Sequence, residues 1–173
     1  GSYKIQVLTL QKRRVRICRS APVQMGVAHA LENFAQGVER TRQEAVAMNV
    51  YDRYVLPYLI DFACGLPMVQ AQRRQLVPQA QGRVLEVGMG TGRNLTFYDH
   101  SRVSRLVGVD PAMQMHRLAQ KRSQKAGIAV ELMGLSAEQL PTADASFDTV
   151  VCTYTLCSIP DALQALREMR RVL

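Results

Sequence analysis

Three alternating glycines after an apolar run are the residues of this chain best suited to binding a ligand. Residues 84–87 form the run and include Glu86, and Gly88, Gly90 and Gly92 follow it. Glycine accepts backbone angles that side chains forbid, and it lets a ligand touch the main chain. The pattern predicts a strand, a tight turn around a small molecule and the start of a helix. A glycine-rich turn without a ligand is the alternative.

The spacing of the glycines distinguishes between classes of nucleotide. Turns that bind nicotinamide or flavin dinucleotides read G-x-G-x-x-G, and their third glycine lets the helix pack on the sheet. Arg93 stands at that third position here. A nicotinamide-dependent oxidoreductase is therefore disfavoured.

A carboxylate closes the next apolar run. Asp110 ends residues 105–110 and lies 18 residues beyond Gly92. An ionised Asp at that place can accept hydrogen bonds from two ribose hydroxyls, each contributing about 1.5 to 3 kcal/mol. The alternative is that Asp110 only caps the helix that Pro111 begins; both roles are compatible.

Two further strand-like segments follow. Residues 128–133 are apolar and lead into Ser136, Ala137 and Glu138, and residues 147–154 form a β-branched run typical of a buried strand.

These segments, taken in order, resemble the class I, Rossmann-like methyltransferases that use S-adenosylmethionine (SAM). The glycine loop reads [D/E]-x-G-x-G-x-G, and the resemblance covers roughly residues 51–173. Phe97-Tyr98 and Leu156-Cys157-Ser158 are similar to the branch that contains thiol, quinone and phospholipid methyltransferases.

The resemblance implies a SAM site that leaves S-adenosylhomocysteine after transfer. In this family an acid at the position of Ser136 accepts from the adenine amino group; a neutral hydroxyl should weaken that contact by about 1 kcal/mol. The implied cofactor-binding residues are Glu86, Gly88, Gly90, Gly92, Asp110, Pro111, Met113, Ser136, Ala137, Glu138, Thr153 and Tyr51.

The expected activity is methyl transfer to a small-molecule acceptor that is a thiol, a quinol or lipid-like. The alternative is a SAM-binding fragment with little or no activity. Tyr51, Tyr154 and Cys157 are candidates for the acceptor side, but the sequence assigns no catalytic residue. Tyr51 belongs either to a lid over the cofactor or to packed core.

The elements that must position these residues alternate along the chain. We expect strands at 83–88, 105–110, 128–133 and 147–154, and helices at 67–76, 91–99, 111–126 and 160–172. Right-handed crossovers then give a three-layer α/β sandwich with a mainly parallel sheet, and the ligand belongs at the carboxyl ends of the strands.

The chain ends at Leu173, where domains of the resembled family continue into further strands. We therefore expect a domain that lacks the last of the usual seven strands and has an open sheet edge. Such an edge invites pairing with another chain. We expect either a homodimer formed through that edge, in which the N-terminal segment can serve as a substitute strand, or marginal stability.

Composition fits one globular domain with a basic start. Residues 1–31 contain six of the 22 Lys and Arg and none of the 14 Asp and Glu, so the rest of the chain is nearly neutral despite a net charge of +8. A nucleic-acid partner is not expected. We expect a basic extension at 1–40 and the methyltransferase domain at 41–173.

The cysteines and histidines indicate neither a metal nor a disulfide framework. The four cysteines contain no C-x-x-C pair and the three histidines are scattered, which favours a reducing, cytoplasmic compartment. No stretch approaches the roughly 20 apolar residues that span a bilayer.

Overall fold

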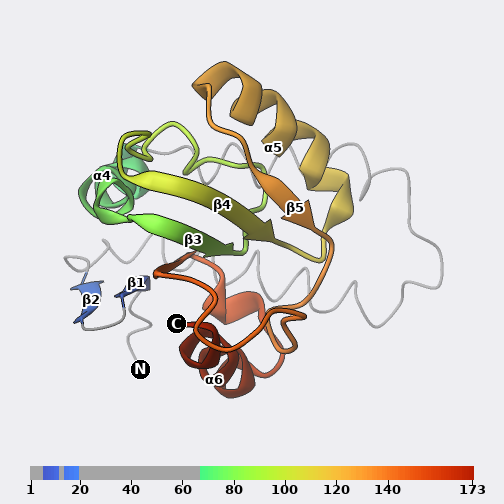
Figure 1. Ribbon diagram of the computed structural model, residues 1–173. Helices are drawn as coiled ribbons and strands as arrows, with labels where there is room; N and C mark the ends of the chain where they lie inside the picture. The colour runs from blue at the N-terminus through green and yellow to red at the C-terminus, as the bar shows by residue number, and fades with distance from the viewer. Residues whose placement is uncertain (1–5, 12–13, 20–66) are drawn as a thin grey trace, which may run out of the picture.

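A six-stranded sheet, in the order β2-β1-β6-β3-β4-β5, forms the centre of the molecule (Figure 1). The structure, a computed structural model, describes residues 6–11, 14–19 and 67–173. The strands are β1 Gln6–Gln11, β2 Arg14–Arg19, β3 Gly82–Val87, β4 Val103–Val109, β5 Glu131–Met133 and β6 Thr149–Thr153. The helices are α4 Pro67–Leu76, α5 Met113–Ala126 and α6 Ala162–Val172, with 3-10 turns η1 Val77–Gln79 and η2 Leu156–Ser158.

The four predicted strands form the parallel part of this sheet. β3 pairs with β4 on one side and with β6 on the other, and β5 continues beyond β4, all in parallel. The strand order therefore reverses between β3 and β6. In open α/β sheets, ligands bind at such a switch point, outside the carboxyl ends of the strands.

Two apolar cores cover the two faces of the sheet. Along β3, Leu85 and Val87 belong to one core and Val84 to the other, because successive strand residues face opposite sides. The first core includes Met169 of α6 and the second includes Ala119 of α5. Figure 1 shows these helices on opposite sides of the sheet, which confirms the predicted three-layer α/β architecture.

The predicted helix over 91–99 is wrong, because the segment forms consecutive turns. Its backbone bonds run from residue i to i−3, as in Leu95 to Gly92 and Phe97 to Asn94. The side chains of Asn94 and Tyr98 are turned inward and bond to a buried carboxylate. These tertiary contacts outweigh local helix propensity.

The other predicted elements are present, most of them with shifted ends. The strand expected over 128–133 shortens to β5, because Ile128 bonds back to Ser123 through its amide and its carbonyl. Gly127, at φ 70°, ends α5 in the left-handed conformation typical of a helix C-terminus. The helix predicted over 67–76 coincides with α4.

The N-terminal segment contributes two strands to the sheet. β1 pairs antiparallel with β2 and also with β6, from Val7 opposite Thr153 to Gln11 opposite Thr149. β1 thus takes the place of the substitute strand expected from the sequence and covers the edge of β6, while the homodimer stays a prediction. The boundary expected near residue 40, Tyr51 and the predicted lid all lie outside the described residues.

Candidate functional site

The turns that carry the predicted site residues lie together at one edge of the sheet. The glycine loop follows β3, Asp110 follows β4, the Ser136 turn follows β5, and Tyr154 follows β6. Since these four strands are parallel, their carboxyl ends meet on the same side. We call this side the carboxyl edge.

Among the described residues, only one of the three glycines leaves room for a Cβ. All three have positive φ, at 73° for Gly88, 53° for Gly90 and 77° for Gly92. A Cβ on Gly88 would lie 2.0 Å from the Thr155 hydroxyl oxygen, and one on Gly92 would lie 2.6 Å from a Leu95 methyl. A Cβ on Gly90 would meet nothing closer than 3.9 Å. Of the three, Gly90 is therefore the glycine that the packing of the described residues does not itself require.

Asp110 ties the glycine loop to the end of β4. One carboxylate oxygen accepts from the Gly90 amide at 2.8 Å, and the other accepts from the Ala112 amide at 2.8 Å. Both oxygens keep a further lone pair, because an ionised carboxylate offers about four acceptor positions. The half-buried carboxylate can therefore receive two more donors, as a ribose would supply.

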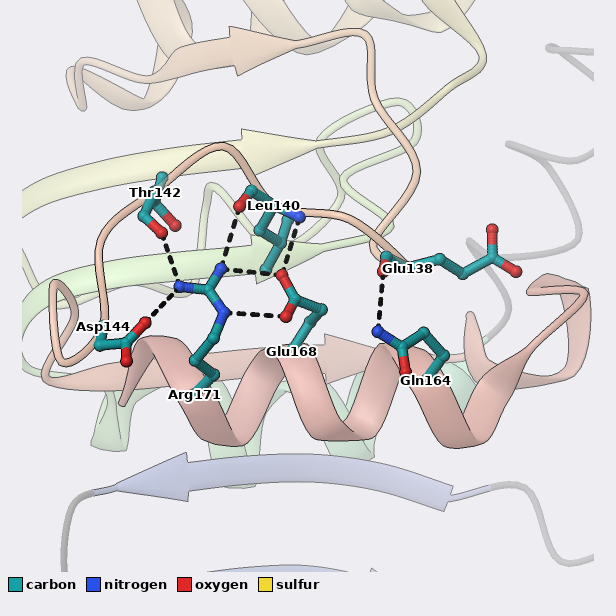
Figure 2. A network of polar contacts seen from close by, with 7 residues as sticks. All are labelled: Glu138, Leu140, Thr142, Asp144, Gln164, Glu168 and Arg171. Carbon is teal, nitrogen blue, oxygen red and sulfur yellow. Dashed lines mark hydrogen bonds and ion pairs between the residues drawn. The ribbon is translucent and has the colours of Figure 1, made fainter.

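The Ser136 turn is fastened to the start of α6. The Ser136 hydroxyl donates to one Glu138 carboxylate oxygen at 2.6 Å, and the other oxygen accepts from the Asp161 amide at 2.7 Å. The Gln164 amide group reaches the Glu138 carbonyl at 3.4 Å, as Figure 2 shows. Ala137, which lies between Ser136 and Glu138 in the sequence, is buried. The turn is thus set by the protein itself before any ligand arrives.

Met113 and Pro111 flank this turn from the α5 side. Met113 is 66% exposed, and its Cγ lies 2.8 Å from where a Cβ on Gly134 would stand. Pro111 is exposed. The contact with Gly134 puts the exposed Met113 thioether beside the turn that follows β5.

Arg171 clamps the rest of this loop onto α6 (Figure 2). Its guanidinium donates to the carbonyls of Leu140 at 3.0 Å and Thr142 at 2.8 Å, and to the Asp144 carboxylate at 2.7 Å. It also pairs with both oxygens of Glu168, which in turn accepts from the Leu140 amide. The hydrogen bonds from Arg171 and Leu140 lower the pKa of Glu168 to about 2.

Glu86 lies beneath the glycine loop with both carboxylate oxygens engaged. It is 1% exposed; one oxygen accepts from the Asn94 amide group at 3.0 Å and the other from the Tyr98 hydroxyl at 2.7 Å. Burial raises the pKa of Glu86 to about 7, against the opposing effect of the Tyr98 hydrogen bond. The predicted contact between Glu86 and the cofactor stays a prediction, and the structure gives this carboxylate protein partners instead.

The same network reaches α4 and the end of β6. Arg73 donates to the Asn94 carbonyl oxygen at 2.5 Å and to the Thr153 hydroxyl at 2.9 Å, and Asn94 donates to that hydroxyl at 3.0 Å. Thr153, also a predicted cofactor residue, thus has its side-chain oxygen inside the network. We call Arg73, Glu86, Asn94, Tyr98 and Thr153 the buried polar network.

Three members of this network were not expected from the sequence. Asn94 and Tyr98 carry a weak signal, because they are polar residues placed just beyond a glycine loop. Arg73 carries none, since Arg73-Arg74 looks like the solvated face of a helix. Its burial depends on the tertiary position of α4.

Tyr154 is the residue that directly follows β6. Its backbone is in the left-handed region at φ 58°, and its hydroxyl donates to the Gln72 side chain. Cys152 is buried with a pKa raised by burial to about 12, while Cys157 is exposed, and both are free thiols. No group of metal-binding side chains large enough to hold an ion occurs in the part of the chain that the structure describes.

Comparisons with known proteins agree with this arrangement. The family model "Methyltransferase domain" matches residues 85–173, just over half of the chain. Phosphatidylethanolamine N-methyltransferase of Cereibacter sphaeroides is 35% identical over 118 residues, covering 66% of this chain and 57% of the relative. Human thiol S-methyltransferase TMT1B is 33% identical, covering 61% and 47%.

Solved structures show the same fold. The YcgJ protein of Bacillus subtilis is 31% identical with a TM-score of 0.52, over 60% of this chain and 44% of that one. The chain spans about half the length of the curated relatives it matches. From the family match and the sheet together, the chain belongs to the methyltransferase domain family, whose Rossmann-like fold binds S-adenosylmethionine.

Proposed function

We propose that this chain binds SAM at the carboxyl edge and transfers its methyl group to a small-molecule acceptor. The observation that carries the proposal is the Gly90 main chain, where a Cβ would meet no described atom closer than 3.9 Å, beside the Asp110 carboxylate that accepts from its amide. It combines an approachable main chain with an acceptor suited to ribose hydroxyls, at the switch point of a methyltransferase sheet.

The described residues fit the parts of SAM in order along the edge. The Asp110 carboxylate would hold the ribose, and the Ser136 turn with Met113 would hold the adenine. Ser136 already donates to Glu138, so its oxygen remains available as a neutral acceptor. Tyr51 remains a predicted contact.

Bound SAM supplies an electrophilic methyl carbon, because that carbon is attached to a positively charged sulfur. The protein contributes by positioning the acceptor in line and by excluding water, which can account for much of the rate. No described residue is assigned as a base: the Tyr154 hydroxyl is already donated to Gln72, and the Cys152 thiol is buried.

For the acceptor, a thiol, a quinol or a lipid-like molecule is proposed. What supports these classes is that relatives covering part of this chain are named for thiols and for phosphatidylethanolamine. A cytoplasmic location is proposed from the cysteine pattern, and no described helix is long and apolar enough to span a membrane. A homodimer remains a proposal that sedimentation would test.

The experiment is a calorimetric titration with SAM, S-adenosylhomocysteine and NADH, followed by methyl transfer to a panel of thiols, quinols and amines. Binding of both SAM compounds and not of NADH is expected, with transfer to one acceptor class. Binding without transfer to any acceptor would favour the alternative, a SAM-binding domain of little activity. Binding of NADH alone would refute the proposal.

A further inference from the structure

Two consecutive side chains of helix α4 contact two segments of the carboxyl edge, the segment after β3 and the end of β6. Arg73, only 5% exposed, bonds to Asn94 of the glycine loop and to Thr153 at the end of β6. Its guanidinium carbon also lies 5.1 Å from the centre of the Tyr154 ring, within the range of a cation–π interaction. The preceding residue, Gln72, accepts the Tyr154 hydroxyl.

Asn94 lies between two buried groups of opposite charge. Its carbonyl oxygen accepts from Arg73, and its amide nitrogen donates to Glu86. Because Arg has no acceptor, the carbonyl oxygen of Asn94 must face Arg73, which leaves the amide nitrogen to donate to Glu86. Asn94 lies two residues beyond Gly92. Its fixed orientation therefore restrains the end of the glycine loop.

The two sides of the edge are thus joined through one guanidinium. On one side Arg73 reaches the glycine loop, which leads to Gly90; on the other it lies against Tyr154, whose left-handed backbone needs support from its surroundings. A cofactor bound over Gly90 and an acceptor beside Tyr154 would need these two segments at a constant separation.

We propose that Arg73 is a positioning residue of the methyl-transfer site, which holds the glycine loop through Asn94 and the Tyr154 segment through its guanidinium face. The inference rests on the proposed function, because it concerns the same site. It adds that the cofactor side and the acceptor side are set by one residue of α4, which lies outside the matched family segment.

The test compares S-adenosylhomocysteine binding by calorimetry in the wild type, Arg73→Met, Arg73→Lys and the control Arg74→Met. Arg74 neighbours Arg73 but is exposed, with its guanidinium 6.0 Å from the Phe97 ring. We expect Arg73→Met to weaken binding at least tenfold and Arg74→Met by less than twofold. Arg73→Lys should lie between them, because lysine keeps the charge without the planar fork.

A double-mutant cycle separates positioning from a general loss of stability. If Arg73 acts on the loop through Asn94, Arg73→Met should weaken binding much less in an Asn94→Ala background than in the wild type. The amide signal of Gly90 in a nitrogen–proton NMR spectrum should move in Arg73→Met and not in Arg74→Met. A purely structural role would give equal effects in both backgrounds and an unmoved Gly90 signal.

A variant that removes both buried charges is the control for loss of folding. Arg73→Met leaves Glu86 without an opposing charge, whereas Arg73→Met with Glu86→Gln leaves neither charge unpaired. If the single variant does not unfold cooperatively in urea, the paired variant replaces it in the titration.

The outcomes separate this inference from the proposed function. Wild-type protein that binds neither SAM nor S-adenosylhomocysteine overturns the proposed function, and this inference with it. Wild-type binding together with unchanged affinity in Arg73→Met, or in the paired variant that replaces it, overturns only the role of Arg73. Unchanged affinity in both Arg73→Lys and Arg73→Met would likewise overturn only the role of Arg73.

Discussion

At the scale of single residues, the glycine loop combines two different demands on its glycines. Gly88 and Gly92 are required by the protein's own packing against Thr155 and Leu95, whereas a Cβ on Gly90 would stand only at ordinary contact distance from Met115 and Asp110. The three look equivalent in the sequence. Thr155 follows β6 and Ala119, the other neighbour of Gly92, lies in α5, so the difference between the glycines depends on contacts that local sequence does not contain.

This difference predicts that alanine at Gly92 mainly lowers stability, whereas alanine at Gly90 mainly weakens SAM binding. Gly92→Ala should lower the free energy of unfolding by about 1 to 2 kcal/mol through backbone strain and by about 1 to 3 kcal/mol more, because its methyl meets Leu95 and Ala119. Gly90→Ala should cost only about 1 to 2 kcal/mol of backbone strain while weakening SAM binding strongly. Urea denaturation and calorimetry check both. If the two variants lost SAM affinity in the same proportion to their loss of unfolding free energy, the different roles of Gly90 and Gly92 would be contradicted.

Glu86 predicts a specific pH dependence. Its folded pKa of about 7 lies above its ordinary value of 4.5, so between these values the folded state holds more protons than the unfolded state. The free energy of unfolding should therefore fall as pH rises through that window. In Glu86→Gln this fall should be reduced.

Urea denaturation at pH 5, 6 and 7 measures the effect as a difference between wild type and Glu86→Gln. Other titrating groups affect both proteins and cancel. Parallel curves for the two proteins would contradict the assignment of a raised pKa to Glu86.

At the scale of elements, the sequence predicted which segments are strands better than where they end. The apolar runs predicted β3, β4, β5 and β6 as parallel strands, and their carboxyl ends carry the motifs as expected. The helix expected over 91–99 was wrong, because Asn94 and Tyr98 serve Glu86 rather than a helical face. Side chains that bond to a buried partner are not visible in a propensity pattern.

The clamp between α6 and the loop after β5 predicts acid sensitivity. The pKa of Glu168 is lowered from 4.5 to about 2 by Arg171 and the Leu140 amide, so Glu168 contributes stability that is complete above pH 4.5 and lost as pH falls toward 2. Glu168→Gln should be less stable than wild type at pH 7, and the gap should narrow progressively as pH falls below 4.5.

Thermal unfolding of both proteins between pH 3 and 7 measures that gap. Arg167→Gln, which changes an exposed residue next to Glu168 in sequence, provides the control. A gap between wild type and Glu168→Gln that stays constant across the whole range would show that the carboxylate is not the stabilising group.

At the scale of the whole molecule, β1 and β2 extend a sheet whose other four strands lie between Gly82 and Thr153. The sequence indicated that β6 needs a neighbour, but it could not show that β1 pairs with it in an antiparallel register. Pairing between segments so far apart depends on the assembled sheet and not on either segment alone.

Removal of residues 1–19 is expected to expose the outer edge of β6. An unpaired apolar edge favours pairing with another chain, so the shortened protein should self-associate at micromolar concentration in sedimentation experiments and unfold at a lower temperature. Val15→Pro, confined to the outer strand β2, should have a smaller effect. A shortened protein with the oligomeric state and unfolding temperature of the intact chain would contradict the role of β1.

The account as a whole depends on a nucleoside bound by Asp110 at the carboxyl edge, and one titration tests this most directly. S-adenosylhomocysteine is titrated into wild type and Asp110→Ala, with the unfolding of each followed in urea. Loss of the charge-assisted bonds to ribose should weaken binding by about 1 to 3 kcal/mol while unfolding stays cooperative. Equal affinities in the two proteins would contradict the site as described.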